Sequence, residues 1–295
     1  MDRGRLRFFI ATALGLAALA ARGAPEDALW YLQVDNDVVF GTDRWYSSGL
    51  RLARVSDKME WGLLQEIYTP DSKRARFADI DRVPAARLLV SAAHHEREPQ
   101  SWRTLEVSLG VRGPAALGRR AQEIAHRFAP APPVDWSRQS PNRLDASVAW
   151  VRSQPFLDER VNSHYGVVVG NVITFAHAGL ELRIGSGSAR TISSPVLRFA
   201  ATPPTTSEGL AERGWSALVG ASARFVARNE LLSHRAGEGA PDLVRESWVG
   251  RYLAGVTWAA SWGSVAFALV QDSREFQGQR LPHRFGSLTV HLAAF

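Results

Sequence analysis

The chain contains no cysteine among its 295 residues. This absence excludes a disulfide-stapled scaffold, an iron–sulfur protein, a thiolate zinc site and a cysteine nucleophile. Other signatures are missing as well: the sequence has no Gly-x-Ser-x-Gly elbow, no Walker loop and no dinucleotide-binding glycine pattern. The usual motifs of nucleotide-dependent enzymes and of elbow-type serine hydrolases are therefore absent.

Long apolar runs are scarce. Apart from Phe8–Ala21, no stretch approaches the roughly 20 apolar residues that a membrane helix needs, and the mean hydropathy is -0.15. A bundle of membrane helices is therefore excluded. A membrane β-barrel is not, because its alternating strands average to near-neutral hydropathy. With 45% hydrophobic residues and 24 Gly, the chain is too apolar for a disordered protein and too rich in glycine for a coiled coil.

The N-terminus has the pattern of a secretory signal. A basic stub with three arginines at positions 3–7 precedes the 14-residue apolar run Phe8–Ala21. Within this run, Ala18-Leu19-Ala20 fits the small-x-small rule for signal cleavage. We therefore predict a signal peptide over residues 1–20 and a mature protein over 21–295, with an N-terminal membrane anchor as the alternative.

The mature chain would be mildly basic, with 32 basic against 28 acidic residues and a net charge of +4. Export and so small a charge argue against nucleic acid as a partner. A basic exported surface instead suggests contact with anionic lipid or polysaccharide.

After residue 29 the dominant hydrophobic period is two, which is typical of strands with one apolar and one polar face. About ten to twelve such stretches are separated by clusters of Gly, Pro, Asn and Asp. Clear examples are residues 50–55, 104–111, 144–151, 178–184 and 287–292. Strands do not alternate with long helices, so a parallel α/β fold is not expected.

Two all-β folds fit this pattern: a soluble sandwich or barrel, and a closed antiparallel transmembrane barrel occupying residues 21–295. We favour the membrane barrel because many aromatic residues are predicted near strand ends, as in the aromatic girdles of such barrels. These residues are Trp30, Trp45, Trp61, Trp102, Trp150, Trp248, Trp258 and Trp262.

One segment breaks the period of two. Residues 115–128 carry apolar residues at helical spacing, and the prolines at 130, 132 and 133 end the pattern. Gln122 and His126 are four residues apart, so they share a face of this helix. A short helix in a β chain is a candidate site for function, although it could also be a connector packed on the barrel rim.

The chain has two polar clusters near its mature N-terminus. Asp35-Asn36-Asp37 and Ser47-Ser48-Gly49 offer carboxylate, amide, hydroxyl and carbonyl oxygens, the hard ligands that Ca²⁺ prefers. They could equally be turn formers at strand ends. His126 stands apart from the other histidines because it lies on the isolated helix, where a neutral imidazole could take a proton from water.

Short motifs over residues 30–145 resemble, in order, those of the outer-membrane lipid A 3'-O-deacylase family. They are Val34-Asp35-Asn36-Asp37, Tyr46-Ser47-Ser48-Gly49, Gln65-Glu66-Ile67-Tyr68-Thr69-Pro70 with Lys73, Asp81-Arg82-x-Pro84, Leu109-Gly110-x-x-Gly113-Pro114, Gln122-x-x-x-His126 and Trp136-x-x-Gln139-x-x-Asn142-Arg143.

The resemblance implies a closed barrel of about twelve strands with a short helix near the active site. It also implies Ca²⁺-dependent removal of the 3'-linked acyloxyacyl chain from lipid A, with water activated by histidine. Carried over by position, the implied catalytic residues are His126, Asn36, Ser47 and Lys73. The implied metal ligands are Asp37 and Gly49.

The same reading places the mature chain in the outer membrane as a monomer. Lipid A or lipopolysaccharide is then the substrate, and outer-membrane lipids surround the protein. These expectations follow from the resemblance together with the predicted export signal.

The chain departs from the family at one position. The family has an active-site Glu shortly after the histidine, whereas residues 127–135 contain none. Asp135 is the acid that could replace it. Two alternatives follow: a catalytically inactive barrel that binds glycolipid, and an outer-membrane phospholipase with a Ser/His/Asn set.

Overall fold

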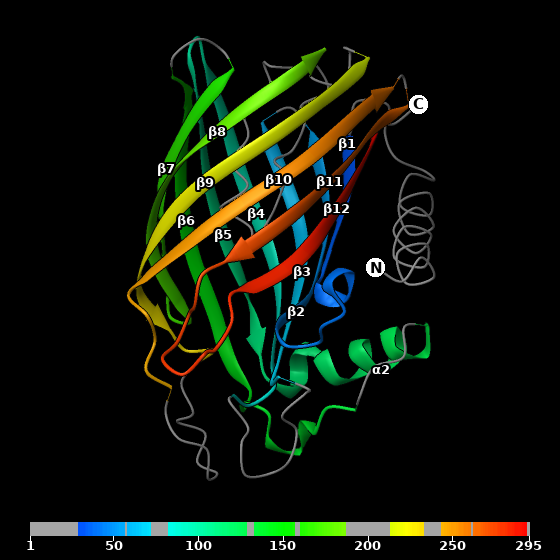
Figure 1. The fold of residues 1–295 in the computed structure, drawn as a ribbon, viewed down its shortest axis with the longest axis vertical. Coiled ribbons are helices and arrows are strands. Elements are labelled where there is room, and N and C mark those ends of the chain that lie inside the picture. Colours follow the sequence, from blue (N-terminus) through cyan, green and yellow to red (C-terminus); the bar gives the residue numbers. More distant parts are fainter. Residues whose placement is uncertain are drawn as a thin grey trace.

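The structure is a computed structural model that describes residues 29–56, 58–71, 82–128, 133–156, 160–186, 213–232, 243–260 and 262–293. Within these ranges, twelve antiparallel strands form a closed barrel (Figure 1). Each strand pairs with its neighbours in sequence, and β1 closes the sheet on β12. The predicted all-β barrel is thus confirmed. The predicted signal peptide, residues 1–20, lies outside the described residues.

The strands are β1 (Leu29–Asn36), β2 (Trp45–Ser56), β3 (Met59–Thr69), β4 (Ala85–Glu98), β5 (Ser101–Arg112), β6 (Arg143–Pro155), β7 (Val161–Gly170), β8 (Ile173–Ser186), β9 (Gly214–Asn229), β10 (Trp248–Ala260), β11 (Gly263–Asp272) and β12 (His283–Ala293).

The predicted short helix is also present, as α2 (Gly118–Phe128). In the described ranges three single-turn helices accompany it: η1 (Asp37–Phe40), η3 (Pro114–Ala116) and η4 (Trp136–Arg138). None of the helices in the described ranges is both long enough and apolar enough to cross a membrane.

The barrel is polar inside and apolar outside. On β5, Thr104, Glu106 and Ser108 are buried in the lumen. Between them, Leu105, Val107 and Leu109 point outward with exposed fractions of 49%, 51% and 51%. In water such a surface would be unfavourable, whereas in a bilayer lipid tails cover it. The period of two seen in the sequence therefore reflects a lipid-facing exterior.

Ion pairs fill the polar part of the lumen. The Arg51 guanidinium lies 2.6 Å from a carboxylate oxygen of Glu60 and 3.3 Å from one of Glu106. Arg87 similarly bridges two acids, at 3.2 Å from Glu66 and 2.8 Å from Asp145. Buried charges are tolerated when they are paired and hydrogen-bonded in this way. These pairs cross-link the wall from within.

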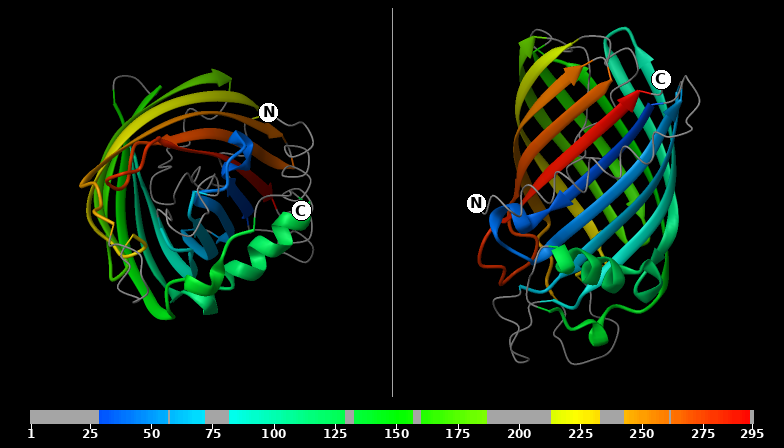
Figure 2. Two further views of the ribbon diagram at one scale, coloured as in Figure 1. Left: turned by 60° about the horizontal axis from the view of Figure 1, so that its bottom comes forward. Right: turned by 90° about the vertical axis from the view of Figure 1, so that its right-hand side faces the viewer.

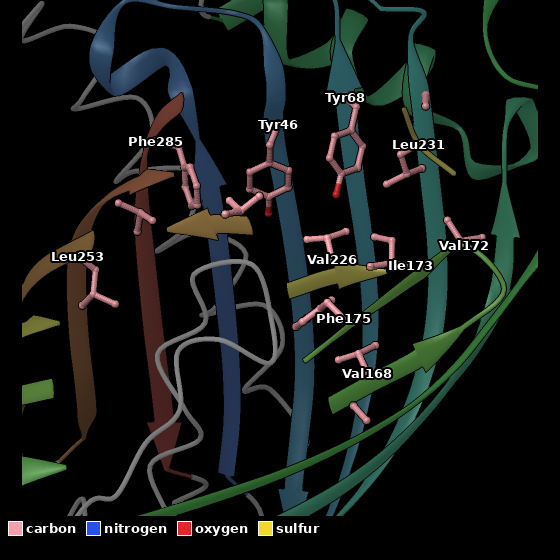
Figure 3. Packing of buried hydrophobic residues seen from close by; sticks show 14 of the residues in the cluster. Tyr46, Tyr68, Val168, Val172, Ile173, Phe175, Val226, Leu231, Leu253 and Phe285 are labelled. Carbon is pink, nitrogen blue, oxygen red and sulfur yellow. The ribbon is translucent and has the colours of Figure 1, made fainter. Parts of the chain in front are cut away.

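An apolar cluster occupies the lumen at the end where β1 leads into η1 (Figure 3). Tyr46, Tyr68 and Phe285 pack there against aliphatic side chains from β7 to β10. Tyr46 and Phe285 meet edge-on, with ring centroids 5.0 Å apart. This cluster brings aromatic rings from β2, β3 and β12 together beside the η1 connection.

The two ends of the barrel differ in their connections. At the end that holds the start of β1 and the end of β12, the turns at 57–58, 99–100 and 261–262 have two residues each, the connection 156–160 has five, and 187–213 is the long exception. At the opposite end, the connections 70–84, 113–142 and 230–247 are long, and 171–172 is the short exception. Outer-membrane barrels place short turns in the periplasm and long loops outside the cell. The loop end, with η1 and α2, is therefore the external end.

The segment that carries α2 lies on the outside of the barrel wall (Figure 2). Glu66 and Arg87 pair in the lumen, so their strand neighbours Ile67 and Ala86 point outward. Both are nonetheless buried, because Ala116 and Trp136 of the α2 segment cover them. The helical segment thus replaces lipid over this patch.

Close packing of the segment depends on a glycine at the start of α2. A Cβ on Gly118 would lie only 2.4 Å from Cβ of Ala86 and 2.9 Å from the Trp136 ring. The Gln65 side-chain amide also donates to the carbonyl oxygen of Ala116 at 2.7 Å. These contacts hold the start of α2 against the last residues of β3 and the first residues of β4.

One aromatic prediction is wrong. Trp61, Trp248 and Trp258 are more than half exposed, as expected of a girdle, but Trp45 is only 2% exposed. Trp45 instead packs edge-on against Phe276. A bulge in β2 directly after Tyr46 shifts the pairing with β3. Beyond this bulge, Leu232 and Phe276 form a buried cluster with Trp45 and cover its indole.

The inside-out surface gives a stability prediction. Val107→Arg places a charge in the middle of a lipid-facing strand, and we expect it to lower the free energy of unfolding by about 2–4 kcal/mol. Urea titration in lipid vesicles, read by the heat-modifiable shift of the folded band on gels, measures the effect. Val244→Arg is the control, because Val244 is 57% exposed in a connection outside the strands. Equal midpoints for the two variants would contradict the lipid-facing assignment.

Candidate active site

His126 lies near the end of α2, where its imidazole faces the rim of the barrel. Its Nε2 atom is 3.2 Å from Oδ2 of Asp43, and the side chains are 22% and 12% exposed. Asp43 comes from the connection between η1 and β2, so the contact joins two segments that are distant in sequence. An imidazole held by a carboxylate at a partly open surface is an arrangement that can take up a proton.

The Asp43 carboxylate is held by further donors. The side-chain amide of Gln122 lies 3.4 Å from each carboxylate oxygen, and the Thr69 hydroxyl lies 3.4 Å from Oδ1. The orientation of Gln122 is set by Trp136, whose indole N–H donates to Oε1 of Gln122 at 2.8 Å. Because one end of the amide accepts from the indole, the other end donates to Asp43. The predicted shared face of Gln122 and His126 is confirmed, since both contact Asp43.

Asn36 and Asp37 form the turn that enters η1. The Asn36 side-chain oxygen caps η1 by accepting from the backbone N–H of Val38 at 2.7 Å. Asp37 is buried, and its Oδ2 accepts from the Thr42 hydroxyl at 2.7 Å and from the Arg44 backbone N–H at 2.9 Å. These bonds fold the 37–44 connection onto itself and place Asp43 toward α2.

Asp37 lies in an unfavourable position for a negative charge. Burial, and then the neighbouring charge of Asp43, raise the pKa of Asp37 well above its usual value. Both of its side-chain hydrogen bonds go to Oδ2, and Oδ1 accepts none from the described residues. Two carboxylates that repel each other beside an available oxygen form a site that a cation would stabilise.

Ser47 and Gly49 lie on β2. Ser47 is buried at the bulge, and its hydroxyl donates to the carbonyl oxygen of Ile67 at 3.3 Å. Gly49 pairs with Asp35 across the sheet, and any Cβ there would overlap the Tyr46 hydroxyl. That hydroxyl donates to Oδ2 of Asp35 at 2.8 Å. Both residues therefore have structural contacts of their own, and their roles in a site stay predictions.

Two further candidates have different outcomes. Lys73 lies outside the described residues. Asp135 is exposed and caps η4 by accepting from the backbone N–H of Ser137 at 2.9 Å, and no contact joins it to His126 among the described residues. The carboxylate beside His126 is that of Asp43, which the motif comparison did not single out. The only sequence signal for Asp43 is that it is an acid six residues after Asp37.

The residues fit a calcium ion through their chemistry. The described part of the chain contains no group of three or more His, Cys, Asp and Glu placed to hold a metal ion. Ca²⁺, however, accepts hydroxyl, amide, backbone carbonyl and water oxygens as well as carboxylates. Asp37 and Asp43 supply the charge for such a site, and the folded 37–44 connection supplies neutral oxygens.

Comparison with known proteins agrees with the fold. The profile of the family described as outer membrane protein LpxR matches residues 8–294. Among solved structures, LpxR from Salmonella typhimurium has a TM-score of 0.73 at 21% identity, covering 90% of this chain and 99% of that chain. The CymD monoaromatic hydrocarbon channel reaches a TM-score of only 0.33 at 9% identity, over 100% of this chain and 94% of that chain, which supports no argument. A search of curated proteins finds no match.

At 21% identity, the Salmonella structure bears on the fold alone. The family profile goes further, because it spans nearly the whole chain and includes every motif identified in the sequence. The chain therefore belongs to the outer membrane protein LpxR family, the lipid A 3'-O-deacylase family that its motifs resemble.

Proposed function

We propose that this protein is a calcium-dependent outer-membrane esterase that removes the 3'-linked acyloxyacyl chain from lipid A, with water activated by His126 as the nucleophile. The observation that carries the proposal is the His126–Asp43 contact of 3.2 Å at the external end of the barrel. Membership of the LpxR family supports the reaction class.

The location of the pair suits a lipid substrate. α2 lies on the outer side of the wall, so the pair is near the level where the strands leave the membrane (Figure 2). A glycolipid of the outer leaflet could bring its sugar ester to this level while its acyl chains stay in the bilayer. The lumen, by contrast, is filled by ion pairs and the apolar cluster.

Asp43 can set the chemistry of the imidazole. When Nε2–H of His126 donates to Asp43, the lone pair is on Nδ1, which can accept a proton from water. The oxygen of that water bonds to the ester carbonyl carbon, and the bond from this carbon to the sugar oxygen breaks. The proton on His126 then passes to the leaving sugar oxygen, which gives a free fatty acid and a hydroxyl on the glycolipid. Asp43 stabilises the imidazolium between the two steps.

The remaining predicted residues act around this centre. Asp37, with Asp43 beside it, would hold Ca²⁺, and the carbonyl of Gly49 is a further proposed ligand. When bound, the ion would supply positive charge for the ester oxygen as the negative charge develops there. Asn36 and Ser47 would position water and ester, and Lys73 would pair with a phosphate of lipid A.

The first test removes the proposed base. We expect His126→Ala to lower deacylation by about 10²–10⁴-fold while the barrel stays folded, because the water then has no proton acceptor. Mass spectra of lipid A from expressing cells measure the product, and heat-modifiability on gels checks folding. His94→Ala, at an exposed position on β4, is the matched control. Full activity of folded His126→Ala would remove His126 as the base.

A second test asks which acid replaces the family's Glu. Asp43→Asn should reduce kcat by about 10²-fold or more, because an amide neither fixes the histidine tautomer nor stabilises the imidazolium. Asp135→Asn should leave kcat unchanged, since Asp135 only caps η4. Steady-state deacylation kinetics on purified variants compare the two. The reverse ranking would assign the role to Asp135.

Calcium dependence is tested by chelation. EDTA should abolish deacylation, and added Ca²⁺ should restore it, because the paired charges of Asp37 and Asp43 need a cation between them. Asp37→Asn should raise the calcium concentration required for half-maximal activity by at least tenfold. Activity that is indifferent to chelation would discard the metal. If lipid A is left intact and phospholipid is cleaved, the phospholipase alternative is favoured instead.

A further inference from the structure

The side of α2 that faces away from the barrel carries one large apolar and two basic residues, and a second large apolar residue comes directly before the helix. Arg120, Ile124 and Arg127 are spaced by four and three residues, which aligns them along the helix, and Leu117 directly precedes α2. We call these four residues the outer face of α2. Leu117 and Ile124 are 46% and 56% exposed, so both side chains are available for contact.

The two arginines of the outer face have no partner among the residues that the structure describes. Arg119, which borders this face, pairs with Glu123 at 2.8 Å. Arg120 and Arg127, by contrast, make no ion pair or hydrogen bond with the described residues. Two unpaired guanidiniums beside exposed apolar side chains fit an anionic surface with an apolar layer beneath it.

The position of α2 agrees with such a surface. The helix packs on the outer ends of β3 and β4, and Leu63 and Val90 are exposed to lipid further along these same strands. α2 is thus held at the edge of the apolar band, at the level of lipid head groups. Figure 2 shows the helix beside the ring of strands and not over its opening.

We propose that the outer face of α2 docks on the phosphate-bearing head groups of lipid A in the outer leaflet. The guanidiniums of Arg120 and Arg127 bind phosphate oxygens through paired hydrogen bonds. Leu117 and Ile124 enter the boundary between head groups and acyl chains. This inference rests on the proposed function in one respect: the same helix carries His126, so docking sets the depth of the imidazole relative to the ester.

The absence of cysteine makes a direct binding test possible. Ile124→Cys can be labelled with a single polarity-sensitive fluorophore in the full mature protein, refolded in nanodiscs of phosphatidylcholine, phosphatidylglycerol or lipid A. We expect the emission to shift to shorter wavelength with lipid A, and the shift to be lost when Arg120→Gln and Arg127→Gln are added. Arg119→Gln is the matched control and should keep the shift.

Several results would overturn the docking proposal. An equal shift in all three lipids would show that apolar contact alone operates, and an equal shift in phosphatidylglycerol and lipid A would show a general anionic preference. A shift that survives the double arginine substitution would remove the guanidiniums from the interaction. None of these readouts requires turnover, so they stand even if the protein proves to be inactive.

Deacylation kinetics give a second test of the docking proposal. With lipid A in vesicles, the Arg120→Gln/Arg127→Gln variant should show a KM raised roughly tenfold, while Arg119→Gln keeps the wild-type KM. An unchanged KM for the double variant, with deacylation intact, would contradict docking and leave the proposed function standing. Loss of deacylation by His126→Ala with the fluorescence shift retained would separate catalysis from docking.

Discussion

Backbone hydrogen bonding in lipid is the constraint on which the rest of this structure depends. No water is present in the hydrocarbon region to satisfy an open sheet edge, so the sheet must close, and β1 pairs with β12 along its full length. Closure forces every strand to present one face to lipid and one to the lumen. In the described lumen, acids and arginines compensate one another, as Arg51 does with Glu60, and the apolar cluster fills the external end. A reactive site can then be built at the rim and on the outer wall, where connections leave the sheet.

The fold could be predicted from sequence because nearly every strand shows the same alternation of apolar and polar residues. Leu105 faces lipid and its neighbour Glu106 faces the lumen. This alternation can be recognised in the sequence without knowing which strands pair with each other. The helix was predictable for a similar reason, since its apolar spacing is local. The burial of Trp45 was not predictable, because it depends on Leu232 and Phe276, which are distant in sequence.

The candidate site was only partly predictable. His126 and Gln122 share a helix face, which spacing alone establishes, but their partner Asp43 is brought to them by closure of the barrel and by the folded 37–44 connection. Asp43 belongs to no helical or strand periodicity that would have identified it in the sequence. Asp135 was a candidate because it follows His126 in sequence. In the structure α2 ends at Phe128 and Asp135 caps η4, so closeness along the chain does not bring it to the imidazole.

The position of Asp43 between Asp37 and His126 has an electrostatic consequence. A cation held at Asp37 and an imidazolium at His126 would repel each other in a partly buried site, where screening by water is weak. A carboxylate that lies 3.2 Å from Nε2 of His126 and also near Asp37 reduces this repulsion on both sides. A Glu that follows the histidine on the same segment could hold the imidazole in place. Such a Glu need not lie between the imidazole and the cation, as Asp43 would. The family's missing Glu and the presence of Asp43 are therefore consistent with one site in which a single acid from the η1–β2 connection serves both neighbours.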